Sequence, residues 1–107
     1  MNLTKAALAA LIARAFERHG MSAHNAALVA SVVAAAERDG AASHGLLRME
    51  GYIATLKSGW VDGKAVPVVT HPAPSIIAVD AQNGFAQVAL AAARDLAVAT
   101  ARSQGMV

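Results

Sequence analysis

Apolar residues recur at steps of three and four through the first half of the chain, and this spacing constrains the fold most. Such steps place side chains on one face of an α-helix. A first helix is predicted over residues 4–19, with Gly20 placed to end it in a left-handed conformation. A second helix is predicted from Ser22, a suitable N-cap, to about residue 38. The two apolar stripes consist of Leu8, Leu11, Ile12 and Phe16, and of Leu28, Val29, Val32, Val33 and Ala36.

A third helix is predicted to begin around Ser43-His44-Gly45 and to run to about residue 58, where Gly59 follows. Its apolar residues keep the alternating spacing that is typical of a buried stripe. They are Leu46, Met49, Ile53, Leu56 and Trp60.

The pattern changes at Pro67, where short β-branched segments replace the helical spacing. Residues 66–70 and 75–79 are predicted to form two short strands or extended segments. Residues 81–84 form a predicted turn, and a last helix is predicted over residues 85–103. The fold class is therefore α+β and mainly helical: an N-terminal helical bundle, a short β-segment and a long helix.

We expect two parts, residues 1–63 with the helices and residues 64–107 with the start of an α/β part. Met106 and Val107 look like the beginning of another strand, which favours a chain that is cut off there. The chain has 107 residues, of which 56% are apolar and 15% charged, so it should expose more apolar surface than a small monomer covers easily.

Composition also excludes several classes of site. Without cysteine, the chain has no disulfide and no thiolate metal site, which fits a cytoplasmic protein. The net charge is +2 and the basic residues are scattered, which argues against nucleic-acid binding. No apolar run approaches the roughly 18 residues of a membrane span. His19, His24 and His71 stand alone, so we expect no metal site.

The residues best suited to chemistry are Ser43, His44, Arg48 and Tyr52. In a continuous helix the last three would form one polar stripe, because each step of four residues turns the direction by about 40°. Histidine can deliver a proton to a reacting atom, and arginine binds a carboxylate with two hydrogen bonds. A serine beside the histidine can orient its ring. The set suits a small anionic substrate that is protonated during the reaction.

A structural interpretation of the same residues is also open. A polar stripe opposite an apolar one occurs on any amphipathic surface helix, and Ser43 could simply be an N-cap. The chain has no glycine-rich phosphate loop of the usual types, so it contains no recognisable cofactor-binding residues.

Two blocks of sequence resemble a known family. The first runs from Arg38 through Ser43-His44-Gly45 to Arg48 and Tyr52, and the second comprises residues 58–63 and 79–87. Together they resemble the malate/L-lactate dehydrogenase-like oxidoreductases, and in particular the branch that reduces Δ1-piperideine-2-carboxylate and Δ1-pyrroline-2-carboxylate.

This resemblance implies an enzyme with a fold other than Rossmann, of which the chain is the N-terminal part. It implies that His44 donates a proton, that Ser43 is its relay partner, and that Arg48, with a weaker case for Tyr52, binds the substrate. It further implies NADPH or NADH bound mainly by residues outside this chain, a homodimer, and an inactive isolated segment.

Two other functions stay open at this stage. A dehydrogenase of 2-hydroxy or 2-oxo acids, such as malate, lactate or ureidoglycolate, would use the same histidine to protonate a carbonyl oxygen. A non-enzymatic, alanine-rich helical interaction module would explain the high apolar content and the absence of a cofactor motif.

Overall fold

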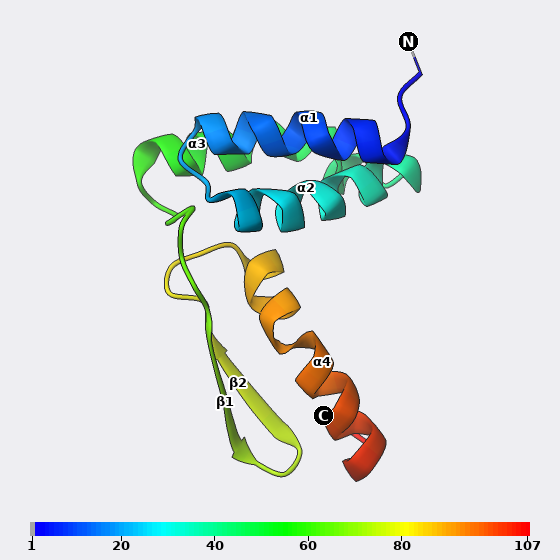
Figure 1. Cartoon of the computed structure of the whole chain (residues 1–107), viewed down its shortest axis with the longest axis vertical. Coiled ribbons are helices and arrows are strands. Elements are labelled where there is room, and N and C mark those ends of the chain that lie inside the picture. The colour runs from blue at the N-terminus through cyan, green and yellow to red at the C-terminus, as the bar shows by residue number, and fades with distance from the viewer. Residues whose placement is uncertain (1) are drawn as a thin grey trace.

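The structure is a computed structural model that describes residues 2–107. In Figure 1, three α-helices lie together as one layer, and a β-hairpin and the last helix extend from it as an arm. The elements, in chain order, are α1 (Lys5–Arg18), α2 (Ala23–Arg38), η1 (Ala42–His44), η2 (Leu46–Arg48), α3 (Met49–Ser58), β1 (Val68–Ala73), β2 (Ile76–Asp80) and α4 (Ala86–Gln104). The predicted α+β class, with its bundle, β-segment and long helix, is confirmed.

Helices α1 and α2 form an antiparallel pair (Figure 1). The predicted caps at Gly20 and Ser22 are confirmed, and Thr4 caps the start of α1. Thr4 Oγ1 accepts a hydrogen bond from Ala7 N at 3.1 Å, and Ser22 Oγ accepts one from Asn25 N at 3.3 Å. Gly20 has the expected positive φ, 95°. Each cap satisfies one of the backbone donors that a helix leaves open at its start.

The core lies between these helices and the first turn of α4. Small alanines at four-residue steps on α2 let neighbouring helices approach closely, while a few larger side chains fill the remaining space. The buried cluster consists of Ile12, Phe16, Met21, Ala26, Val29, Ala30, Val33, Ala34, Phe85 and Val88. Two members of the predicted stripes, Leu11 and Val32, are instead 46% and 49% exposed.

The prediction of one continuous third helix is wrong. Residues 42–48 form two 3₁₀ turns separated by Gly45, and α3 begins only at Met49. Gly45 has φ −95° and ψ −133°, which is not helical. The predicted buried stripe is also wrong at its ends, because Leu46 is 42% and Trp60 76% exposed.

Strands β1 and β2 pair in antiparallel fashion, with Val69 opposite Val79 and an irregularity between Thr70 and Ala73. The predicted turn at residues 81–84 is confirmed, and Gln82 and Asn83 both have positive φ there. Asparagine tolerates this region better than most residues.

A buried asparagine joins the helical layer to the arm. Asn25 Nδ2 donates to Gly63 O at 3.0 Å and to Ala65 O at 2.9 Å, and Ser22 N also donates to Gly63 O, at 3.1 Å. Gly63 must be a glycine here, since an added Cβ would lie 2.9 Å from the Met21 Cα. Hydrogen bonds from the start of α2 therefore hold the segment that leads to the hairpin.

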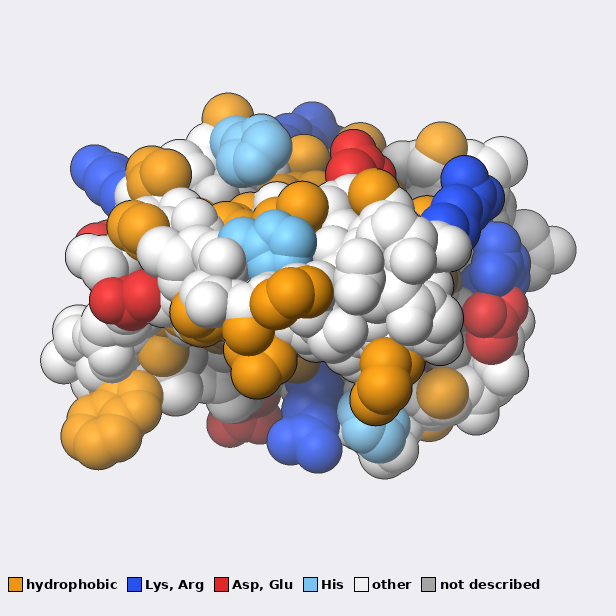
Figure 2. Space-filling model, turned by 90° about the horizontal axis from the view of Figure 1, so that it is seen from below, with side chains coloured by type: hydrophobic (Ala, Val, Ile, Leu, Met, Phe, Trp, Pro, Cys, Tyr) orange, Lys and Arg blue, Asp and Glu red, His pale blue; other side chains and the backbone are white. Residues whose placement is uncertain are grey.

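The expected excess of apolar surface is present. The most exposed large apolar side chains are Leu47, Trp60, Val66, Leu90 and Met106. Figure 2, which looks at the molecule from below, shows hydrophobic side chains spread over this face, with both signs of charge around its edge. Within residues 2–107, no helix combines the length and apolar character that a membrane crossing needs.

We expect Asn25→Ala to lower the free energy of unfolding by about 2 kcal/mol, because the buried Ala65 carbonyl loses its donor while Gly63 O keeps Ser22 N. Urea denaturation followed by circular dichroism measures this. Asn2→Ala, at an exposed position, is the matched control and should change stability by less than about 0.5 kcal/mol. Equal stability of the two variants would contradict this stabilising role of the Asn25 hydrogen bonds.

Candidate active site

The candidate site is built on the two 3₁₀ turns at residues 42–48. Backbone hydrogen bonds run from Gly45 N to Ala42 O at 3.1 Å and from Arg48 N to Gly45 O at 3.0 Å. These turns place Ser43, His44 and Arg48 on the outside of the molecule, where all three are exposed. The break at Gly45, rather than a continuous helix, therefore brings the polar residues together.

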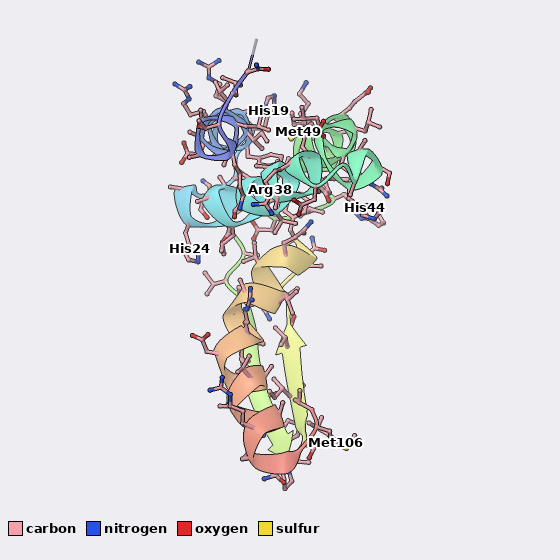
Figure 3. The ribbon with its side chains drawn as sticks, turned by 90° about the vertical axis from the view of Figure 1, so that its right-hand side faces the viewer. His19, His24, Arg38, His44, Met49 and Met106 are labelled. Atoms are coloured by element: carbon pink, nitrogen blue, oxygen red, sulfur yellow. The ribbon has the colours of Figure 1, made fainter. Side chains whose placement is uncertain are left out.

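Ser43 and His44 are in direct contact. Ser43 Oγ lies 3.0 Å from His44 Nδ1, a distance suited to a hydrogen bond. The contact orients the ring and engages Nδ1 rather than Nε2. In Figure 3, His44 lies at one end of the helical layer, well apart from His24 and from Met106 at the tip of the arm.

Arg48 folds back on the same turn. Its Nε donates to Ser43 O at 2.8 Å. This bond engages one side of the guanidinium group and leaves the paired terminal nitrogens for a carboxylate, the planar contact that arginine makes best. The predicted trio of Ser43, His44 and Arg48 thus forms one connected cluster.

Tyr52 is placed differently from its three candidate partners. Its half-buried ring stacks edge-on against Phe85 at 5.4 Å and lies 6.2 Å from Phe16. Its hydroxyl accepts a hydrogen bond from Gln87 Nε2 at 3.0 Å. The predicted polar stripe of His44, Arg48 and Tyr52 on one helix is therefore wrong, because the helix breaks at Gly45. A substrate contact for Tyr52 stays a prediction.

Two polar residues at this site had no role in the sequence analysis. Gln87 fell within a block that resembled the family, yet only the structure connects it to Tyr52, 35 residues away. Glu37, on the last turn of α2, accepts a hydrogen bond from Leu46 N at 2.9 Å. The spacing of residues in the sequence does not predict either contact, since each joins residues of separate elements.

An exposed ion pair lies beside the turn. Arg38 Nε is 2.6 Å from Asp39 Oδ1, and Arg38 Nη2 donates to Asp39 Oδ2 at 3.0 Å. The hydrogen bond from Arg38 holds the pKa of the Asp39 carboxyl below its ordinary value. Asp39 therefore stays ionised and paired with Arg38 rather than with the candidate site.

The glycine before α4 is not shaped to bind the phosphates of a nicotinamide dinucleotide. Gly84, the glycine just before α4, is packed against Ala65, where an added Cβ would lie 2.7 Å from the Ala65 Cβ, so it does not open a phosphate cradle. Within the part of the chain that the structure describes, no cluster of three histidine or acidic side chains could hold a metal ion. The site brings together a histidine and an arginine, side-chain types that are suited to proton transfer and to carboxylate binding.

Comparisons with known proteins agree on one family. The malate/L-lactate dehydrogenase family matches residues 3–107. Over 99 residues, 92% of this chain, the sequence is 54% identical to a Δ1-pyrroline-2-carboxylate/Δ1-piperideine-2-carboxylate reductase from Pseudomonas putida, of which it covers 29%.

Solved structures show the same likeness. The crystal structure of Δ1-piperideine-2-carboxylate reductase from Pseudomonas syringae matches with a TM-score of 0.94 and 49% identity, over 97% of this chain and 31% of that one. Malate dehydrogenase from Pyrococcus horikoshii matches with a TM-score of 0.84 and 28% identity, over 98% of this chain and 30% of that one. The chain thus spans less than a third of these relatives' length, and its expected fold likeness is confirmed.

We expect Gly45→Ala to destabilise the protein by about 1–3 kcal/mol, because the new Cβ would overlap the Glu37 carboxylate and lie 3.2 Å from the Glu37 backbone. Gly51→Ala is the matched control. Gly51 lies within α3 with nothing within 4 Å of an added Cβ, so alanine there should be neutral or should stabilise by up to about 1 kcal/mol. Equal effects of the two changes on the urea midpoint would contradict the close packing of Gly45.

Proposed function

This chain belongs to the malate/L-lactate dehydrogenase family, and from that premise we propose that it is the N-terminal part of an NAD(P)H-dependent reductase of cyclic imino acids. The reaction would convert Δ1-piperideine-2-carboxylate to pipecolate and Δ1-pyrroline-2-carboxylate to proline. The connected cluster of Ser43, His44 and Arg48 carries the proposal, because it combines a proton donor with a carboxylate clamp.

Each residue of the cluster has a defined part in this chemistry. Arg48 holds the substrate carboxylate through its terminal nitrogens, which fixes the adjacent C=N bond near His44. His44 gives a proton to the imine nitrogen while the imine carbon receives a hydride, so that the C=N double bond becomes a C–N single bond. Ser43 orients the imidazole through Nδ1. Tyr52 is also proposed to contact the substrate, with a weaker case than that of Arg48.

The proposed reductant is NADPH or NADH, held mainly by residues outside this chain, since the sequence has no glycine-rich phosphate loop of the usual types. We assign the motif to residues 1–63 and the start of an α/β part to residues 64–107. The complete protein is proposed to be a cytoplasmic homodimer that acts on a small imino or 2-oxo acid and binds neither nucleic acid nor a membrane. The scattered basic residues support the absence of a nucleic-acid role.

A substrate of the 2-oxo acid class is the principal alternative. Malate dehydrogenase from P. horikoshii shares the fold of this segment at 28% identity, and the same cluster could protonate a carbonyl oxygen. The 54% identity to a reductase of cyclic imino acids favours the imine substrate. Membership of an enzyme family also favours an enzyme over the non-enzymatic interaction module.

We expect the complete gene product to reduce both cyclic imino acids with NADPH or NADH, and His44→Ala to lower kcat by roughly 10²–10⁴-fold, the usual contribution of general acid catalysis. His44→Asn should not restore the rate, because an amide is no acid near neutral pH. Ser43→Ala should have a milder effect, and KM for the cofactor should be unchanged. Steady-state absorbance at the nicotinamide band measures these rates; a near-normal kcat for His44→Ala would sink the mechanism.

We expect Arg48→Lys to weaken transition-state binding by about 2–4 kcal/mol, because lysine cannot make the two-pronged contact to a carboxylate. The loss should appear in kcat/KM for the imino acid. Lys57→Arg, in α3 and outside the cluster, provides the control for a change of basic residue. An unchanged kcat/KM in Arg48→Lys would show that Arg48 is only a surface residue.

A further inference from the structure

The site turn has little burial to hold it in place. Ser43, His44, Leu46, Leu47 and Arg48 are all exposed, and only the backbone of Gly45 is buried. Apolar packing therefore does little to fix the relative positions of the histidine and the arginine. The hydrogen bonds between residues 42 and 48 close the turn locally but do not attach it to the bundle.

Glu37 supplies an attachment to the bundle. Its Oε2 accepts a hydrogen bond from Leu46 N at 2.9 Å, nine residues further along the chain. Gly45 lies directly against it, because an added Cβ would overlap the carboxylate and come within 3.2 Å of the Glu37 Cα and N. The carboxylate thus bonds to the peptide link between the two 3₁₀ turns, midway between His44 and Arg48.

The arginine next to Glu37 in the sequence does not pair with the Glu37 carboxylate. Arg38, the adjacent cation, is engaged by both oxygens of Asp39. A carboxylate that accepts from a backbone N–H makes a stronger bond than a neutral acceptor does. Glu37 is also only half-buried and lies within the last turn of α2, so a rigid helix sets its position.

We propose that Glu37 is a positioning residue, which holds the Gly45-Leu46 peptide so that His44 and Arg48 face one substrate together. This inference rests on the proposed function. Glu37 touches neither substrate nor cofactor, and acts through the turn. Its loss therefore lowers the rate of the chemical step and leaves cofactor binding unchanged, because misplaced groups no longer meet the substrate in the reactive geometry.

The test compares Glu37→Gln with Glu37→Met in the complete gene product. Glutamine keeps a carbonyl oxygen that can accept from Leu46 N, whereas methionine keeps the side-chain length but has only a weakly accepting sulfur. We expect Glu37→Met to lower kcat for the cyclic imino acid by about ten- to a hundredfold, with KM for the cofactor unchanged. Glu37→Gln should retain kcat within about threefold. Glu50→Met, at an exposed glutamate in the first turn of α3, should match the unmutated protein.

Hydrogen exchange reports on the contact itself, independently of turnover. The Leu46 amide should be protected in the unmutated protein and in Glu37→Gln, and should exchange at least about tenfold faster in Glu37→Met. Equal kcat in all variants, or equal loss in the glutamine and methionine variants, overturns the positioning role. An unprotected Leu46 amide in the unmutated protein overturns it without any variant. If the unmutated protein reduces no cyclic imino acid, the proposed function is wrong. The exchange data then still decide whether Glu37 holds the turn.

Discussion

The arrangement of this chain depends on a single buried amide. Asn25 lies at the start of α2 and donates to two carbonyl groups of the segment that leads out of the helical layer. A buried carbonyl without a donor is costly, so this pairing fixes where the hairpin and α4 begin. Phe85, at the start of α4, then completes the core, and Gln87 on its first turn reaches the Tyr52 hydroxyl.

The second constraint is the close approach of one backbone segment to another. One such approach lies at the proposed functional site. Gly45 has no room for a side chain beside Glu37, just as Gly63 has none beside Met21. At Gly63 the close approach packs the connecting segment against residues 20 and 21. At Gly45 it breaks the helix that the apolar spacing would otherwise continue, and it turns Ser43, His44 and Arg48 outward as a connected group. The exposed motif thus owes its geometry to hydrogen bonds and to a missing Cβ rather than to burial.

Local signals in the sequence were sufficient for most of the fold. Thr4, Ser22, Gly59 and Gly105 lie at helix ends. Pro67 precedes β1, and Pro74 lies in the turn of the hairpin. Periodicity failed at residues 43–48 because Leu46 and Met49 kept a helical spacing through a segment that a tertiary contact from Glu37 breaks. The same limit applied to Tyr52, whose spacing from Arg48 suggested a shared polar face, although its ring packs between Phe16 and Phe85. The residue types of Ser43, His44 and Arg48 pointed to their proposed chemistry, and their mutual contacts are local. The contacts of Glu37 and Gln87 instead join separate elements and depend on packing.

The most direct measurement is a crystal structure of the complete gene product with proline or pipecolate bound beside an oxidised nicotinamide cofactor. The account predicts the carboxylate of the product within about 2.7–3.2 Å of both terminal nitrogens of Arg48, and the ring nitrogen at a similar distance from His44 Nε2. Ser43 Oγ should remain in contact with Nδ1. A product whose carboxylate binds elsewhere, with His44 directed into solvent, would contradict the assignment of this turn as the proton-donating side of a reductase site.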